Sequence, residues 1–377
     1  MRLTFILIVL ALSTLFLAAC GNGGATDTIK IGVAGPMTGP QARNGEELWL
    51  GAALAAEEWN AKGGILGKQI ELIRKDDQAE PKEAEKVANE LIYAGVAAVI
   101  GHYNSGVTFP ASRKYGQKKI IMMTPAATNP VITDGAFEDG FTTIFRVCGR
   151  DDVQGRTAAE FVAGKLKLER VAIFHDKSIY GEGLAKAFKE ALEALGVTIT
   201  LYQGFDDKER NFRPFLPKLR DGDPQLWYFG GIHSQGGALA RQAKESGITI
   251  PFMSGDGVYH PEFLAKAGNK AEGAYFTFPD TDSSPEAKEF IRRYEERWKK
   301  QKGPYSVYSY VTANILFESI AKAENTDGPA IADAIRSMEH DTVFGPISFN
   351  ERGDVTRFVY AIWVVKDGKF TLNSEAE

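Results

Sequence analysis

The stretch AAVIGHYNSGVTFPASRKYGQKKIIMMT (residues 97–124) contains the pattern that decides the fold. It begins with an apolar run at 97–101 and ends with another at 120–124, and both are typical of strands buried on both faces. The residues between the two runs have the character of a helix. A buried strand, a helix and a second buried strand predict two parallel strands joined by a helical crossover.

The same alternation extends over most of the chain. Toward the N-terminus, strands are predicted at 29–35 and 69–75 and helices at 45–62 and 81–93. These units are too many for one sheet of usual width, so we expect two α/β lobes. After residue 147 the pattern predicts, in order, helix 153–166, strand 170–175, helix 181–195, strand 197–203, helix 212–219, strand 225–229, helix 235–246, a strand near Phe252 and mainly helical sequence over 284–324.

The first twenty residues have the layout of a secretory signal. Arg2 supplies a positive charge, residues 3–19 are uncharged and mostly apolar, and small residues precede Cys20. The ending resembles the cleavage box of bacterial lipoproteins, in which the cysteine is lipidated. We expect 1–19 to be a lipoprotein signal peptide and 20–27 a flexible tether. An ordinary cleaved signal or a membrane anchor is the alternative.

Composition excludes several classes of protein. Of the 377 residues, 44% are hydrophobic and 25% are charged, which is typical of a water-soluble globular protein. The net charge is −5 and the basic residues are scattered, so no nucleic-acid partner is expected. Two cysteines cannot form a disulfide framework.

The sequence contains no recognisable enzyme motif. It has no Walker loop, no Gly-x-Gly-x-x-Gly after the first strand and no Gly-x-Ser-x-Gly elbow. Cys148 stands alone in strand-like sequence and is better interpreted as a buried structural residue than as a nucleophile. We therefore expect no enzyme activity and no cofactor. No metal site is expected either, because metal-ligand spacing is missing among the five histidines, at positions 102, 175, 233, 260 and 340.

Two loops follow buried strands and carry hydroxyl groups. One is His102-Tyr-Asn-Ser-Gly106 and the other is Pro125-Ala-Ala-Thr-Asn-Pro130. Ligands of open parallel sheets bind beyond the carboxyl ends of strands, where helix N-termini favour an anion. The two loops together would form a carboxylate seat without a cationic side chain. Ordinary turns that cap helices are an equally good interpretation.

Six motifs are distributed along the chain: Asn60-Ala-Lys-Gly-Gly-Ile-Leu-Gly67, Asp76-Asp77, Ile100-Gly-His102, Thr124-Pro-Ala-Ala-Thr128, His175-Asp-Lys-Ser-Ile-Tyr-Gly-Glu-Gly183 and Thr342-Val-Phe-Gly-Pro346. Together they resemble the periplasmic leucine/isoleucine/valine-binding protein family, and the resemblance covers essentially the whole chain after residue 28. It implies a type I periplasmic-binding-protein fold with two Rossmann-like lobes, parallel sheets and a three-stranded hinge. The implied division is 28–147 plus 280–344 for the N-terminal lobe and 148–279 plus 345–377 for the C-terminal lobe, with crossings near 149–152 and 277–280.

The resemblance also implies ligand-binding residues. Ser105, Ala126 and Thr128 would hold the carboxylate of the ligand, and Tyr180 would close over it from the second lobe. Asp256 falls where the family has an acid for the α-ammonium group, and a buried ammonium needs such a paired charge. The alternative for Asp256 is a simple Asp-Gly turn.

The residues expected around the ligand side chain include departures from the family. Tyr103 and Tyr305 fall at positions that line this pocket, although they could instead be surface aromatics. Asn44 and Ile232 stand where the leucine-type proteins carry aromatic residues, and Asp256 is one methylene shorter than the usual glutamate. The identity of the side chain recognised is therefore left open.

A disulfide of the best-known family members is absent. It joins the loop near Asp77 to the loop of Ser105, and the matching positions here are Ala79 and Asn104. Neither position carries a cysteine, so this chain lacks the whole disulfide and has no unpaired cysteine left over from it.

The implied function is that of an exported, membrane-tethered receptor of an ABC importer, in the periplasm or at the cell surface. It would bind an amino acid, branched-chain or otherwise hydrophobic, between two hinged lobes and deliver it to a membrane permease. We expect a monomer anchored through the lipid on Cys20. The alternatives are the same fold binding an amide, urea or an aromatic acid, or acting as a ligand sensor for a signalling receptor.

Overall fold

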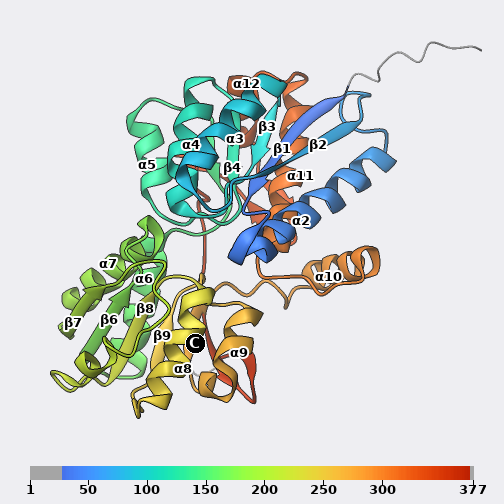
Figure 1. Cartoon of the computed structure of the whole chain (residues 1–377). Coiled ribbons are helices and arrows are strands. Elements are labelled where there is room, and N and C mark those ends of the chain that lie inside the picture. Colours follow the sequence, from blue (N-terminus) through green and yellow to red (C-terminus); the bar gives the residue numbers. More distant parts are fainter. Residues whose placement is uncertain (1–27, 374–377) are drawn as a thin grey trace, which may run out of the picture.

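The computed structural model describes residues 28–373 and has two lobes (Figure 1). The first lobe contains a five-stranded sheet with the order β2-β1-β3-β4-β5, and all of its strand pairs are parallel. Its three central strands are apolar and buried, so helices must cover both faces of the sheet. The strands are β1 (Ile29–Gly35), β2 (Ile70–Asp76), β3 (Ala98–Ile100), β4 (Ile121–Thr124) and β5 (Ile144–Arg146).

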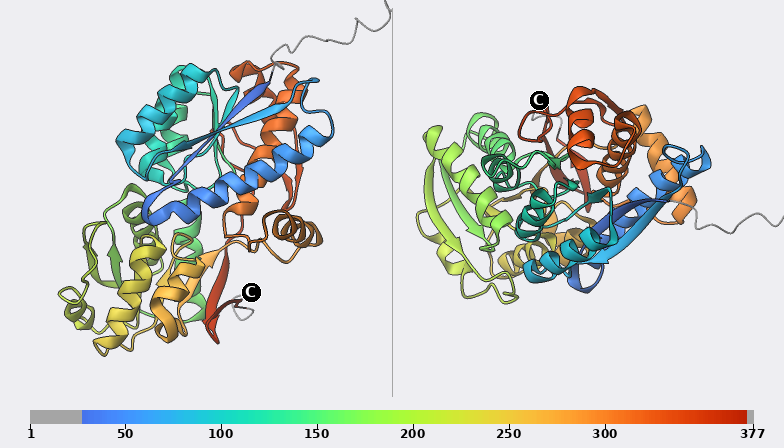
Figure 2. Two further views of the ribbon diagram at one scale, coloured as in Figure 1. Left: turned by 45° about the vertical axis from the view of Figure 1, so that its right-hand side comes forward. Right: turned by 90° about the horizontal axis from the view of Figure 1, so that it is seen from above.

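The helices of the first lobe come from two distant parts of the sequence. Four follow the strands of the sheet, and three more return from beyond residue 280. Helix α2 packs beside α11, as both views of Figure 2 show, because Gly51 of α2 lies against the backbone of Ser306. The helices are α2 (Ala42–Ala61), α3 (Pro81–Ala94), α4 (Ser105–Gln117), α5 (Val131–Glu138), α10 (Pro285–Trp298), α11 (Ser306–Ala323) and α12 (Gly328–Ser337), with a 3₁₀ turn at Gly39–Gln41.

The second lobe contains a seven-stranded sheet with the order β14-β13-β10-β9-β8-β6-β7. Its central strands are parallel, and the last two join as an antiparallel hairpin at one edge. Its strands are β6 (Arg170–His175), β7 (Thr198–Gly204), β8 (Leu226–Gly230), β9 (Phe252–Ser254), β10 (Tyr275–Phe278), β13 (Ala361–Lys366) and β14 (Lys369–Leu372). Its helices are α6 (Asp151–Glu160), which continues as a π-helix over Phe161–Lys165, α7 (Ile179–Ala194), α8 (His233–Glu245) and α9 (Pro261–Ala267), with a 3₁₀ turn at Gly268–Ala271.

Three segments of the described chain connect the lobes. The first two follow β5 and β10, at or beside the predicted stretches 149–152 and 277–280. The third lies later than the sequence implied, because a residue well beyond 344 still contacts the first lobe. Arg146 of β5 donates to the carboxylate of Asp354 at 2.8 Å. These contacts favour a lobe boundary after residue 354, and not after residue 344.

The hairpin before this third segment also belongs with the first lobe. Strands β11 (His340–Thr342) and β12 (Gly345–Ile347) pair with each other, and Phe349 packs edge-on against Phe145 of β5 at 5.6 Å between ring centroids. The division of the chain into lobes otherwise remains a proposal drawn from the resemblance.

The predicted helix over 212–219 is wrong. The structure has only a 3₁₀ turn at Leu216–Arg220. Pro214 and Pro217 lie inside the predicted segment, and each removes a backbone N–H donor and disfavours helical backbone in the residue before it.

Two expectations concern the membrane and the lone thiol. Within residues 28–373, no helix combines the length and the apolar character needed to cross a membrane. The predicted signal peptide, the tether and Cys20 lie outside the described residues. Cys148 is buried as expected, and burial raises the pKa of its thiol, so the unreactive protonated form is favoured.

Candidate functional site

Seven of the nine expected ligand residues converge between the two lobes, around a small cavity of about 20 Å³. They come from loops at the carboxyl ends of strands or from the first turn of a helix, where parallel sheets place their ligands. A cavity of this size has room for about one water molecule. An amino acid therefore enters only if the lobes open or the lining side chains move. The lining residues are Tyr103, Asn104, Ser105, Ala126, Tyr180, Ile232, Asp256, Gly257 and Tyr305.

Asp256 is the charged residue at the centre of this site. It follows β9, it is only 4% exposed, and it accepts hydrogen bonds from residues of both lobes. Tyr180 donates from its hydroxyl to Oδ1 of Asp256 at 2.8 Å, and Tyr305 donates to Oδ2. The N–H of Gly257 donates to the Tyr180 hydroxyl at 2.8 Å, which orients that phenol toward the acid.

The electrostatics of the site follow from its burial. Burial raises the pKa of Asp256 above its usual range, and the hydrogen bonds from Tyr305 and Tyr180 oppose this rise. Burial and the nearby Asp256 raise the pKa of both phenols, so each remains a donor. A cation placed beside Asp256 would favour its ionised form by direct attraction.

Aromatic rings form one wall of the cavity. Tyr103 and Tyr305 pack edge to face with 5.1 Å between their ring centroids, and Tyr305 also meets Phe278 edge-on. Both tyrosines are buried, so the interpretation of these residues as surface aromatics is wrong. Ile232 lies on the cavity wall contributed by the second lobe.

The predicted carboxylate seat is only partly assembled at the cavity. Ser105 begins α4 and lines the cavity with Ala126, and the N–H of Asn129 donates to the Ser105 hydroxyl at 3.3 Å. Thr128 is buried but does not line the cavity. It lies beside Asp151, whose backbone N–H donates to the Thr128 carbonyl at 3.0 Å.

Asn44 also stands apart from the cavity wall. It is buried in α2, and neither atom of its side-chain amide has a hydrogen-bond partner within the described part of the chain. The ligand contact expected for Asn44 therefore remains a prediction.

A larger cavity of about 390 Å³ adjoins the small one at the mouth between the lobes. The two cavities share Asn104, Ser105, Tyr180 and Ile232, so they lie on one path from solvent to Asp256. Asp176, Ser178 and Ile179 also line this cavity and belong to the motif at 175–183, whereas most of the polar lining residues were not predicted because they match no motif. Those with polar or charged side chains include Gln41, Gln78, Glu80, Asp207, Lys208 and Arg210.

Direct contacts hold the two lobes together around this path. The side-chain amide of Asn129 donates to the carbonyl of Ile179 at 2.7 Å. Glu80 and Lys208 form an exposed ion pair at 3.9 Å across the mouth, a type of contact that contributes little. The two lobes are therefore in direct contact at the mouth in the described conformation.

A buried polar pair joins the loops that a disulfide joins in the family. His102 and Asp77 are both fully buried and lie 2.7 Å apart. The other ring nitrogen of His102 lies 3.2 Å from the hydroxyl of Tyr115. The loops near Asp77 and Ser105 are thus held by hydrogen bonds in this chain.

Comparisons with known proteins agree with this architecture. A family model described as periplasmic binding protein matches residues 28–369. An amino acid binding protein of Pseudomonas aeruginosa is 38% identical over 96% of each chain. A leucine-, isoleucine-, valine-, threonine- and alanine-binding protein of the same organism is 36% identical over 90% of each chain. A similar solved structure is that of LivJ, the branched-chain amino acid transporter substrate binding protein from Streptococcus pneumoniae, in complex with isoleucine. The two chains are 28% identical, and their structures superpose with a TM-score of 0.83 over 91% of this chain and 98% of that chain. These relatives are binding proteins and not enzymes.

Proposed function

Because the chain belongs to the periplasmic binding protein family, we propose that it is the receptor of an ABC importer for an amino acid with a branched-chain or other apolar side chain. The observation that carries this proposal is the buried carboxylate of Asp256, which lies between the lobes with Tyr180 and Tyr305 as its hydrogen-bond donors. A buried acid on a path from solvent is suited to an ammonium group, because a buried charge needs a partner.

The rest of the ligand would contact groups that surround Asp256. Its carboxylate would lie at Ser105 and Ala126, near the N-terminus of α4, where a helix favours negative charge. Its apolar side chain would lie against Ile232 and the ring of Tyr103. The named ligands of the relatives from Pseudomonas aeruginosa and Streptococcus pneumoniae support this class of ligand.

Ligand binding would stabilise the closed arrangement of the lobes. Ser105 and Ala126 belong to the first lobe, whereas Tyr180 and Asp256 belong to the second. A ligand shifts a hinge equilibrium only through contacts that differ between the two forms. A solute that touches both pairs of residues makes its full set of contacts only after closure, and the closed form would then dock on the permease.

A ligand panel measured by thermal unfolding tests this proposal. At 100 times its dissociation constant, leucine or another apolar amino acid is expected to raise the melting temperature by about 4 °C. Leucinamide and 4-methylpentanoate lack the carboxylate and the ammonium group, respectively, and both are expected to have little effect. A response to 4-methylpentanoate equal to that of leucine would contradict the role given to Asp256.

A small neutral amide such as urea or acetamide is a second candidate ligand. The small cavity and the two phenols already bonded to Asp256 favour it. Amides, urea and benzoate belong in the same panel, and a response confined to one of them would replace the amino acid in the proposal. Ligand uptake that depends on the gene would distinguish delivery to a permease from a sensor role.

We further propose that Cys20 carries the lipid that tethers the exported protein to a membrane. When membranes are extracted with a detergent that separates into two phases, the wild-type protein is expected in the detergent phase. The Cys20→Ala variant should lose the lipid and move to the aqueous phase or remain an unprocessed precursor. A mature wild-type protein without an acyl group, as measured by mass spectrometry, would exclude the anchor.

A further inference from the structure

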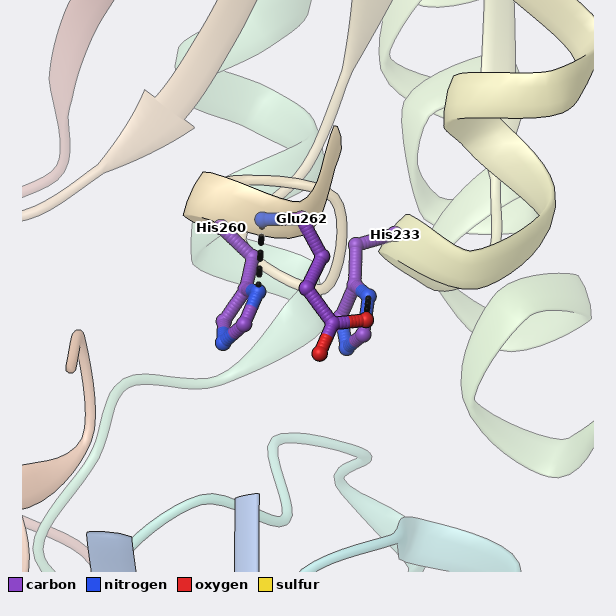
Figure 3. A group of neighbouring side chains, drawn as sticks. All are labelled: His233, His260 and Glu262. Carbon is purple, nitrogen blue, oxygen red and sulfur yellow. Dashed lines mark hydrogen bonds and ion pairs between the residues drawn. The ribbon is translucent and has the colours of Figure 1, made fainter. Parts of the chain in front are cut away.

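Two buried histidines and two glutamates meet at a second place between the lobes, which adjoins the site of Asp256 because Glu47 accepts a hydrogen bond from the N–H of Tyr305 at 3.2 Å. His233 begins α8, His260 precedes α9, and Glu262 lies in the first turn of α9 (Figure 3). Glu47 of α2 approaches from the first lobe, with its Oε1 at 3.3 Å from Nε2 of His260. We refer to His233, His260 and Glu262 as the histidine cluster.

His233 is a buried polar side chain with no satisfied hydrogen bond. It is 2% exposed, and neither ring nitrogen has a hydrogen-bond partner within residues 28–373. The nearest acidic oxygen, Oε2 of Glu262, lies 3.5 Å from Nδ1. A neutral imidazole ring has one nitrogen with a free lone pair. A neutral imidazole is the form that binds metal ions.

Two pairs of these atoms have the separation of ligands in a tetrahedral metal site. Zinc lies about 2.0–2.2 Å from nitrogen and carboxylate oxygen ligands, so neighbouring ligand atoms around it are about 3.3–3.6 Å apart. The pair His260 Nε2 and Glu47 Oε1, at 3.3 Å, and the pair His233 Nδ1 and Glu262 Oε2, at 3.5 Å, both have this separation. Ligand atoms of the histidine cluster all lie within 4.8 Å of one another, whereas Glu47 is not part of that group, so its carboxylate must move closer to the cluster to share an ion.

We propose that the histidine cluster binds a divalent transition-metal ion of the zinc class, and that the carboxylate of Glu47 turns toward the ion and completes its coordination from the other lobe. Imidazole and carboxylate ligands suit zinc and its neighbours in the first transition row. The side chain of Glu262 is 30% exposed and provides the route by which an ion enters.

Binding requires three local changes, the first of which is the movement of the Glu47 carboxylate toward the histidine cluster. The rings of His233 and His260 are stacked, with 4.2 Å between centroids and a tilt of 21°, so one ring must turn before both lone pairs point at one ion. Nδ1 of His260 accepts the N–H of Glu262 at 3.1 Å. If His260 binds the ion through Nε2, the proton of its neutral ring moves to Nδ1. Nδ1 then no longer accepts the N–H of Glu262, so the ring loses this hydrogen bond when it gains the bond to the metal.

The charges around the site are balanced. Glu47 and Glu262 face the cationic side chains of Arg43 and Lys266, at 3.8 Å and 3.7 Å. An ion between the two carboxylates would compete with these cations for the same oxygens. Since the histidine cluster belongs to one lobe and Glu47 to the other, the ion would make more bonds in the closed form and would favour closure.

Calorimetric titration of the metal-free protein with zinc chloride tests the site. We expect one ion per chain with micromolar or tighter affinity, and a loss of at least about tenfold in His233→Gln, His260→Gln and Glu262→Gln. Glu262→Gln changes a partly exposed side chain, so it tests the site without disturbing the buried pair. His340→Gln is the matched control, because His340 is a buried histidine that lies 3.2 Å from Glu318, outside the cluster. Wild-type protein that does not bind zinc saturably, or cluster variants that bind it as the wild type does, would overturn the proposal.

Cobalt and scattering measurements test the geometry and the role of Glu47. Tetrahedral cobalt is expected to give a strong visible absorption band in the wild type that the cluster variants lose. Zinc should reduce the radius of gyration of the wild-type protein but not that of Glu47→Gln. Equal compaction in both proteins would overturn the contribution of Glu47, and this readout is independent of the amino-acid ligand.

Discussion

Asp256→Asn is expected to weaken binding of the amino-acid ligand by about 100-fold or more, which corresponds to about 2.7 kcal/mol. The substitution keeps the size of the side chain and an oxygen that accepts from Tyr180 or Tyr305. It removes the negative charge that would neutralise a buried ammonium group. Calorimetry with the ligand identified in the panel measures the loss.

The physical reason is the low exposure of the site. Asp256 is 4% exposed, so an ammonium group loses its bound water when it enters this position. Only interactions with the protein, above all with the negative charge of Asp256, can compensate for that loss of hydration. Asparagine offers a dipole in place of a charge. Its effect on folding should be much smaller, because the unbound protein has no cation at this position to lose.

Tyr305→Phe is the matched control for this experiment. It removes the hydroxyl that donates to Oδ2 of Asp256 but leaves the charge and the ring. We expect affinity to change by less than about tenfold, which corresponds to 1.4 kcal/mol. If Asp256→Asn bound the ligand as tightly as the wild type, the assignment of this site would be wrong, whatever the result for Tyr305.

Asp354→Asn is expected to lower the free energy of unfolding by about 3–5 kcal/mol, because it leaves a buried guanidinium group without its counter-ion. Arg146 is fully buried and Asp354 is 2% exposed. The guanidinium also donates to the carbonyls of Ala127 and Asn129 at 3.1 and 2.9 Å, so it positions the loop that follows β4. Urea unfolding followed by circular dichroism measures the change.

The loss of stability in Asp354→Asn should become smaller as the pH falls. Burial alone would raise the pKa of Asp354, but Arg146 and Arg150 lower it below its ordinary value of 3.8. A carboxyl group with a lowered folded pKa stabilises the protein above the unfolded pKa and loses that contribution as the pH falls through the folded value. The difference between wild type and Asp354→Asn should therefore be full near pH 7 and shrink below about pH 4.

An exposed ion pair provides the control for Asp354. Asp223 pairs with Arg170 at 2.9 Å, but its side chain is 93% exposed. Asp223→Asn is expected to cost less than about 1 kcal/mol. If both variants lost the same free energy of unfolding, burial would not explain the large cost expected for Asp354→Asn.

Much of the architecture could be predicted from local patterns. The apolar runs at 97–101 and 120–124 correspond to β3 and β4, because short apolar segments followed by turn residues have few ways to be buried. The prediction failed at 212–219, where Pro214 and Pro217 outweigh an apolar spacing that otherwise suggests a helix.

The residues that line the cavity were predicted less evenly. Ser105 and Ala126 could be placed at the cavity because loops after parallel strands share one edge of a sheet. Thr128 and Asn44 carry the right chemistry at matching positions, yet they do not line the cavity. The direction of a side chain depends on the backbone of its own loop or helix, which a motif does not specify.

The sequence alone therefore determined that this protein has α/β lobes with loops capable of binding a ligand, because the periodicity and the apolar runs that specify strands and helices are local. Only the tertiary structure decided which side chains meet. Tyr305 donates to Asp256 across 49 residues of chain, and His260 reaches Glu47 across 213. Such contacts depend on how the two lobes close on each other, and no spacing within either segment contains that information.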